Sequence, residues 1–193
     1  MVLRTRKRIN EALIELIEEK GFEGITIRDL TAKAGINRGT FYLHYRDKYD
    51  LMEKLQSDIL QGFLEIILQL NPIEAIKYFS QNAPYPIMVQ IFDYLKGYGR
   101  ILKVLLSSKG DPAFPKKMKD LIRNNIYEKL VKNKESTLKN VSIAQEYLPA
   151  IGTSANFGVI EQWLENGMIH SPEEMAMIYF KIINFIRSIE IMK

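Results

Sequence analysis

The segment from residue 26 to residue 48 contains side chains suited to hydrogen bonding with nucleic acid. Arg38 can donate two hydrogen bonds to the edge of a guanine base. Gly39 and Thr40 are small enough to allow close approach to a base edge or to a thymine methyl group. The chemistry that these residues indicate is recognition of a DNA duplex through its major groove.

Further polar side chains in the segment are not needed for packing between the helices. Ala34 and Phe41 suit the seam between two packed helices, and the polar residues around them remain available for contact with DNA. Hydroxyl, imidazole and ammonium groups bond to phosphates, as does the backbone at the start of a helix. These additional candidates for DNA binding are Thr26, Arg28, Asn37, Tyr42, His44 and Lys48.

Two short predicted helices position these side chains. Thr26 caps the first of them, and Asp29 lies three residues later, which is the spacing of a capping box. Gly35 permits the sharp turn that follows, because glycine readily adopts a left-handed backbone conformation. Asn37 caps the second short helix, which we expect to run to about His44. Two helices joined in this way form a helix-turn-helix, whose second helix enters the major groove.

Longer amphipathic helices flank this pair. The first is expected to end at Gly21 and carries Ile9, Leu13, Leu16 and Ile17 on one face. The second begins after Asp47 and is expected to run to Pro72. Its apolar residues are Leu51, Leu55, Ile59, Phe63 and Ile67. No linker rich in glycine or serine separates it from the helix-turn-helix, so we expect a rigid connection.

Helical patterns continue to the C-terminus, and no strand or hairpin signal interrupts them. Their expected ranges are 73–82, 87–95, 98–108, 115–134, 142–166 and 172–192. Ser171-Pro172-Glu173-Glu174 is the clearest helix start, since it combines a serine cap, an early proline and acidic residues. We therefore predict an all-α fold with two domains, residues 1–46 and residues 47–193.

Composition excludes several classes of function. The chain has no cysteine and two histidines, and it contains no motif of a known catalytic site, so we expect neither an enzyme nor a metal site or cofactor. Hydrophobic residues make up 47% of the chain, which is enough for a folded core. The sequence shows neither a signal peptide nor a membrane span, so we expect a cytoplasmic protein. The net charge of +4 is too small to indicate DNA binding by itself.

Residues 35–48, with the preceding residues 25–34, resemble the helix-turn-helix signature of TetR-type transcriptional regulators. The resemblance implies an all-helical homodimer with an N-terminal DNA-binding domain and a C-terminal domain for ligand binding and dimerisation. Matched by position, the DNA-facing residues are Thr26, Arg28, Arg38, Thr40, Tyr42, His44 and Lys48. Phe41 and Tyr45 match packing positions, and we expect the Tyr45 hydroxyl to reach solvent or a phosphate. Residues 105–114 and 163–176 resemble, more loosely, one subset of the family.

The C-terminal part is rich in aromatic residues, which have two interpretations. Most of them form a core, but tyrosines on apolar helices also suit a pocket for an apolar or weakly polar ligand. The predicted pocket residues are Phe63, Ile67, Phe92, Tyr94, Tyr98, Tyr127 and Asn156. Control by a protein partner instead of a small molecule is the alternative.

The last two long helices favour self-association, because each carries an apolar face. The residues predicted for a dimer interface are Ile151, Ala155, Val159, Trp163, Ile178, Ile182 and Phe185. A helical adaptor that uses only protein surfaces is a further alternative. The function that the sequence favours is a homodimeric, sequence-specific transcriptional regulator of operator DNA, a repressor that responds to a ligand.

Overall fold

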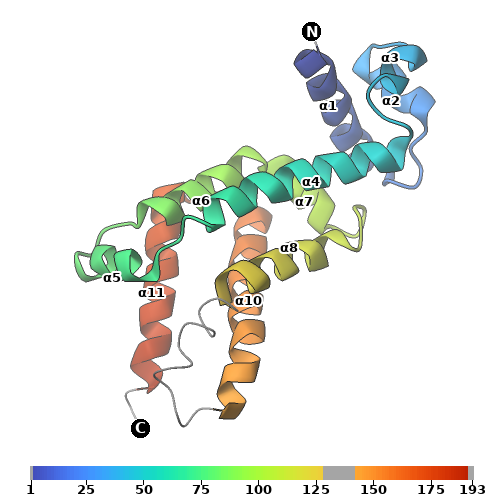
Figure 1. Cartoon of the computed structure of the whole chain (residues 1–193). Coiled ribbons are helices and arrows are strands. Elements are labelled where there is room, and N and C mark those ends of the chain that lie inside the picture. The colour runs from blue at the N-terminus through green and yellow to red at the C-terminus, as the bar shows by residue number, and fades with distance from the viewer. Residues whose placement is uncertain (1, 128–141, 191–193) are drawn as a thin grey trace. The chain divides into compact units, whose positions relative to one another are not determined.

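The computed structural model describes residues 2–127 and 142–190, and within these ranges the chain is helical without strands (Figure 1). This confirms the predicted all-α fold. The elements are α1 (Val2–Lys20), α2 (Ile27–Ala34), α3 (Arg38–Tyr42), α4 (Lys48–Ile67), α5 (Pro72–Ser80), α6 (Pro86–Gly97), α7 (Gly99–Leu106), α8 (Phe114–Ile122), a π-helical turn (Arg123–Tyr127), α10 (Ser142–Glu165) and α11 (Pro172–Glu190). Residues 128–134, predicted to continue a helix, lie outside the described ranges.

The helices form two compact units. The first contains the chain up to Gln61 together with Arg100–Met118, and the second contains Gly62–Gly99 and the chain from Lys119 onward. The boundary therefore falls within α4, and the first unit extends beyond residue 46, where the sequence placed the end of the first domain. A sequence pattern could not reveal that residues 100–118 return to this unit, because their partners are about 50 to 90 residues away.

Polar contacts explain why residues 100–118 belong to the first unit. The Arg100 guanidinium lies 2.7 Å from a Glu18 carboxylate oxygen, and Lys109 Nζ donates to the Glu18 carbonyl at 2.7 Å. The buried Gln56 of α4 donates to Asp111 at 3.0 Å and accepts from Lys117 at 2.8 Å. These contacts fasten the segment to the end of α1 and to α4.

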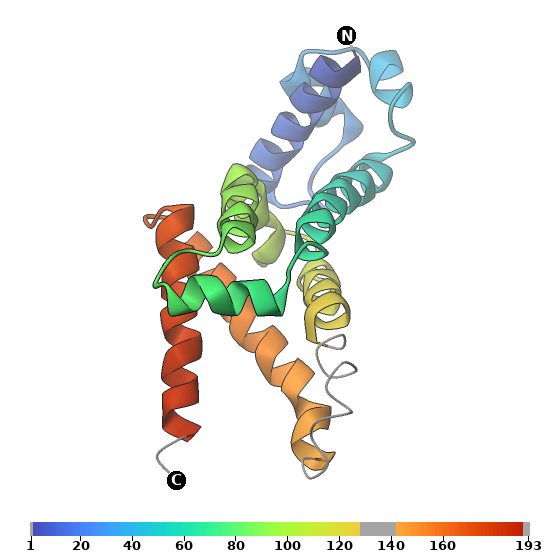
Figure 2. The same cartoon turned by 60° about the vertical axis from the view of Figure 1, so that its left-hand side comes forward.

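The helix-turn-helix forms where the local sequence signals place it (Figure 2). Thr26 Oγ1 accepts from the Asp29 amide at 3.2 Å, while the Asp29 carboxylate accepts from the Thr26 amide at 2.9 Å, so the capping box is confirmed. Gly35 ends α2 with a φ of 59°. Phe41 is fully buried and Ala34 is 4% exposed, which confirms the predicted seam.

Two predicted helix ends in the first 72 residues differ from the structure, and the helix predicted over residues 115–134 ends at Ile122, where the π-helical turn follows. Helix α3 ends at Tyr42 instead of His44, because the amides of His44 and Tyr45 both bond to the Phe41 carbonyl and close the chain into a turn. Helix α4 ends at Ile67, five residues before Pro72. The amides of Gln69 and Leu70 there bond to carbonyls three residues back, which tightens and ends the helix.

The second unit has a core of aromatic and aliphatic side chains. Helices α6 and α11 pack against each other, and the Phe92 and Trp163 rings pack edge to face with their centroids 5.3 Å apart. The Trp163 indole donates to the His170 carbonyl at 3.2 Å. The Ser171 hydroxyl accepts from the Glu174 amide at 3.2 Å, which confirms the predicted start of α11. None of the described helices is both long enough and apolar enough to cross a membrane.

The burial of Phe41 generates a prediction about stability. Phe41→Ala should lower the free energy of unfolding by about 3–5 kcal/mol, because it removes a fully buried ring and leaves a cavity. The neighbouring Tyr42 is 56% exposed and packs against Phe41 through an edge-to-face ring contact at 5.6 Å, so Tyr42→Ala should lower that free energy by about 0.5–1.5 kcal/mol. Urea unfolding of both variants measures the difference, and equal effects would contradict the assigned orientation of α3.

Candidate nucleic-acid interface

Helix α3 combines one buried side chain with several exposed ones. Phe41 anchors it, while Arg38 and Gly39 are exposed and Tyr42 is half exposed. The guanidinium groups of Arg28 and Arg38 form no hydrogen bond or ion pair with any residue that the structure describes. Both predicted arginines are therefore free to bond to another molecule.

Two of the predicted contact residues also fix the start of α3. Asn37 Oδ1 accepts from the Thr40 amide at 2.7 Å and from the Thr40 hydroxyl at 2.9 Å. A Cβ atom at Gly39 would lie 3.3 Å from the same oxygen, so the turn is tight here. The oxygen atoms of both side chains take part in the helix cap. The Asn37 side-chain nitrogen and the Thr40 methyl group are therefore the atoms left for contact with DNA.

The start of α2 is held by charge as well as by its cap. Asp29 lies near the positive end of the α2 dipole, and Lys20 donates to it at 2.6 Å. This hydrogen bond, together with those from Thr26, lowers the pKa of the Asp29 carboxyl well below its usual range. Thr26 itself is exposed, so its backbone region can approach a phosphate as predicted.

Lys48 is occupied within the protein. Its side chain is 14% exposed, and Nζ donates to the carbonyls of Phe22 at 3.1 Å and Glu23 at 2.9 Å. The ammonium also lies 4.9 Å from the centre of the Phe22 ring. Its predicted role at a phosphate remains a prediction, but the structure gives Lys48 a packing role that the sequence did not indicate.

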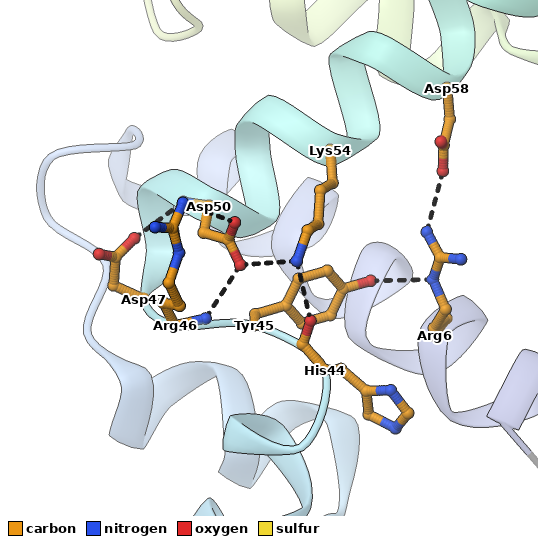
Figure 3. A network of polar contacts seen from close by, with 8 residues as sticks. All are labelled: Arg6, His44, Tyr45, Arg46, Asp47, Asp50, Lys54 and Asp58. Carbon is orange, nitrogen blue, oxygen red and sulfur yellow. Dashed lines mark hydrogen bonds and ion pairs between the residues drawn. The ribbon is translucent and has the colours of Figure 1, made fainter.

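A polar network joins the segment after α3 to α4 and α1 (Figure 3). Lys54 Nζ donates to the His44 carbonyl at 3.2 Å and to the Asp50 carboxylate at 2.9 Å. Asp50 also accepts from the Arg46 amide at 2.9 Å.

Tyr45 differs from expectation, since the residue is 3% exposed and its hydroxyl accepts from Arg6 at 3.4 Å instead of reaching solvent. The buried ring fixes the hydroxyl beside α1. His44 is half-buried; its amide donates to the Phe41 carbonyl at 2.9 Å and its carbonyl accepts from Lys54 at 3.2 Å, while its imidazole remains a predicted phosphate contact.

Sequence reasoning missed two exposed residues at the end of α3. Leu43 is 82% exposed, and the side chain of Arg46 is 83% exposed. The spacing of Phe41 and Tyr45 could have identified Leu43, because residues four apart share the buried face and residue 43 lies off it. An exposed leucine beside Tyr42 suits contact with a thymine methyl group, and Arg46 suits a phosphate.

The predicted pocket residues lie in the second unit and mostly pack together. Phe63, Ile67 and Phe92 are each no more than 3% exposed, and Phe63 stacks on Tyr94 at 6.5 Å between centroids. Tyr94 also lies 4.8 Å from Tyr98, which is 37% exposed. Asn156 accepts from the Tyr179 hydroxyl, and the Tyr127 side chain lies outside the described residues.

A cavity of about 650 Å³ lies within the first unit, away from these predicted pocket residues. The end of α1, the first half of α4 and the segment before α8 line it. Phe22 and Met52 give it apolar walls, and Lys109 and Asp111 give it charged ones. None of the seven predicted pocket residues lines this cavity, so the expected pocket in the second unit remains a prediction.

The predicted interface residues fall into two groups. Ile151 is 65% exposed, Ile182 is 38% exposed and Ala155 is exposed, so these can meet a partner. Val159 and Ile178 are half-buried. Trp163 is 2% exposed and packs inside its own unit, which makes it a core residue and corrects its assignment to the interface. The Phe185 side chain lies outside the described residues.

Two family models match the chain. One, described as "Bacterial regulatory proteins, tetR family", matches residues 9–55. The other, described as "Transcriptional regulator C-terminal region", matches residues 82–185, which is more than half of the chain. The chain belongs to the TetR family of transcriptional regulators. The matched residues 9–55 include the whole helix-turn-helix and the start of α4.

Individual TetR-like proteins are similar over different lengths. The HTH-type transcriptional regulator SAB2452 of Staphylococcus aureus (strain bovine RF122 / ET3-1) is 29% identical over 104 residues, which are 54% of this chain and 52% of that protein. The matched regions span between 20% and 52% of the length of the first curated relatives.

Solved structures share the TetR fold. A TetR transcriptional regulator from Streptococcus agalactiae 2603V has a TM-score of 0.61 at 22% identity, with 94% of each chain covered. The transcriptional regulator FadR from Bacillus subtilis, solved in complex with stearoyl-CoA, has a TM-score of 0.58 at 15% identity. That comparison covers 91% of this chain and 96% of FadR.

The Asp50 contacts predict how the stability of this TetR-family protein depends on pH. The hydrogen bond from Lys54, and then that from the Arg46 amide, lower the pKa of the Asp50 carboxyl from 3.8 to about 2. A carboxyl whose pKa is lowered by folding stabilises the protein above its unfolded pKa, and this contribution is lost as the pH falls through the folded pKa. The stability difference between the parent and Asp50→Asn should therefore shrink as the pH falls from 3.8 to about 2.

Urea unfolding at several pH values measures this difference. Asp58→Asn is the control, because the Asp58 side chain is 61% exposed and its ion pair with Arg6 contributes little to stability at neutral pH. A difference between the parent and Asp50→Asn that stays constant over this pH range would contradict the role given to the ionised Asp50.

Proposed function

We propose that this TetR-family protein is a homodimeric, sequence-specific DNA-binding regulator that uses α3 to read operator DNA, and that it acts as a repressor in the cytoplasm. The observation that carries the proposal is the arrangement of α3. Phe41 is fully buried, while Arg38 is exposed with no partner among the described residues. A helix anchored on one side and free on the other is suited to insertion into a groove.

The exposed side chains suit different parts of a duplex. Arg38 can form a bidentate contact with guanine, and Leu43 and the Thr40 methyl group can contact thymine methyl groups. Arg28 and Arg46 can bond to phosphates, which adds affinity but little sequence preference. In this proposal residues 1–46, together with Lys48, supply the contacts with DNA, and the remainder of residues 47–193 serves ligand binding and dimerisation.

Exposed apolar residues support the homodimer. Ile151 on α10 and Ile182 on α11 are large apolar residues that one protomer leaves in contact with water. A two-fold pairing of these helices would cover them. Two recognition helices related by such an axis enter successive major grooves when they lie about 34–36 Å apart, so the operator should be nearly palindromic.

Selection of bound sequences from random DNA with the purified full-length protein tests this function. The proposal expects one enriched motif with two inverted half-sites, and the distance between them reports the spacing of the recognition helices. A protein that acts only through protein surfaces would enrich no motif, and a single unpaired site would contradict the homodimer.

Arg38→Ala should weaken binding to the selected operator by about 1–3 kcal/mol and relax the preference at one base pair in each half-site. The reason is the loss of a bidentate guanine contact. Fluorescence anisotropy with operators changed at single positions measures both effects. Unchanged affinity together with unchanged preference would remove Arg38 from base reading.

Lys48→Ala should instead weaken binding to all sequences alike and reduce the dependence of affinity on salt. Lys48 also bonds to the Phe22 and Glu23 carbonyls, so the substitution can destabilise the protein. The melting temperature of the Lys48→Ala variant is therefore measured together with its affinity for DNA. A variant that melts like the parent and shows the parent's salt dependence would exclude a phosphate contact by Lys48.

Control by a small apolar or weakly polar ligand is the second part of the proposal, and Thr153 on α10 supports it. The residue is 5% exposed, and its hydroxyl oxygen has no hydrogen-bond partner in the described part of the chain. A buried hydroxyl without a partner is unfavourable, and a ligand that supplies one would relieve this. The structure of FadR from Bacillus subtilis, which shares this fold, contains stearoyl-CoA, and this supports a ligand with an apolar part.

Thr153→Val should raise the free energy of unfolding by up to about 1 kcal/mol in the ligand-free protein, since it removes an unpaired buried hydroxyl. It should also reduce the thermal shift caused by a ligand that bonds to this hydroxyl. Thr153→Ser, which keeps the hydroxyl, is the matched control. No thermal shift of the parent across a library of apolar compounds would favour control by a protein partner.

A further inference from the structure

Three side chains of α4 are connected to the segment that follows the recognition helix, two of them directly and the third through Arg6. Asp50, Lys54 and Asp58 are spaced by four residues and therefore lie on one face of the helix. Figure 3 shows Asp50 and Lys54 directed toward this segment and Asp58 directed toward Arg6 of α1. Every contact in this set lies within the first compact unit.

Each of the three residues holds a different part of the segment. Asp50 accepts from the Arg46 amide at 2.9 Å, and Lys54 donates to the His44 carbonyl at 3.2 Å. Asp58 lies 3.0 Å from Arg6, which in turn donates to the Tyr45 hydroxyl at 3.4 Å. The three residues after Leu43 are thus each tied to α4, two of them directly and one through Arg6.

Lys54 contacts two different residues of this segment. Besides the His44 carbonyl, its ammonium bonds to Asp50 at 2.9 Å and lies 5.4 Å from the centre of the Tyr45 ring. A positive charge at this place also suits the negative end of α3. One side chain therefore contacts the backbone after α3, the ring that packs beneath it, and the carboxylate that bonds to the next amide.

We propose that Lys54 is a positioning residue that fixes the orientation of α3 relative to α4, and so sets which spacing of operator half-sites the dimer accepts. The inference rests on the proposed function. Lys54 acts through the His44 carbonyl and the Tyr45 ring and makes no base contact itself. Any loosening of α3 against α4 occurs in both protomers. Both displacements then contribute to the change in distance between the two recognition helices.

The selectivity for half-site spacing separates this role from a purely structural one. The Lys54 side chain is 47% exposed, whereas that of its partner Asp50 is 6% exposed, so removal of the ammonium should also lower the melting temperature. A purely structural role would lower the melting temperature and leave the selectivity for half-site spacing unchanged. Arginine at this position can still donate to both the carbonyl and the carboxylate.

The experiment uses the full-length dimer and operators whose half-sites are moved one base pair closer together or farther apart. Lys54→Met should reduce the preference for the selected spacing by about tenfold, as expected for the loss of one charge-assisted hydrogen bond. The base preference at the pair read by Arg38 should stay unchanged, and Lys54→Arg should restore the spacing preference. Lys33→Met is the matched control, since it also removes one charge and its ion pairs with Glu15 and Glu19 but makes no contact with residues 44–46.

Hydrogen exchange of the DNA-free protein gives a second measurement. Lys54→Met should speed the exchange of amides in residues 38–46 by about tenfold while the rest of the first unit keeps its protection. Unchanged exchange in this segment, or an unchanged spacing preference, would overturn the proposal. Failure of Lys54→Arg to restore the spacing preference would overturn it as well. If the parent selects no operator, the proposed function fails, whereas the exchange measurement still tests the role of Lys54.

Discussion

The recognition helix is too short to be stable alone, and the rest of the first unit compensates for this. Five residues span about 7.5 Å, a length at which an isolated helix does not form in water. Asn37 and Thr40 close its start, the buried Phe41 anchors its middle, and contacts from α4 hold the chain after its end. The neighbouring elements therefore hold α3 in place, and few of the exposed residues of α3 contribute to this.

Local signals explain what could be predicted of this site. The capping box of Thr26 and Asp29, the left-handed Gly35 and the seam at Phe41 all depend on residues within a few positions of one another, so a single sequence reveals them. The contacts of Lys48 and Tyr45 could not be read in this way. Their partners Glu23 and Arg6 are 25 and 39 residues distant, and only the packed fold brings them together.

The second unit shows a different limit of sequence patterns. An apolar face with a four-residue repeat fits a core, a ligand pocket and a dimer interface equally well, because burial has the same periodicity in all three. Trp163 and Ile151 lie on one such repeat, yet one is buried inside its own unit and the other is largely exposed. Periodicity identifies the faces of α10 and α11 but does not assign them to a partner.

The separation between residues that build α3 and residues that it exposes has an evolutionary consequence. The side chains of Arg38 and Leu43 form no hydrogen bond or ion pair with the residues that the structure describes, so under the proposed function substitutions there would change the preferred operator while the protein still folds. Phe41, Tyr45 and Asp50 lack this freedom, because their side chains are buried. After duplication, two copies of such a regulator could acquire different sets of target genes through a handful of exchanges at exposed positions.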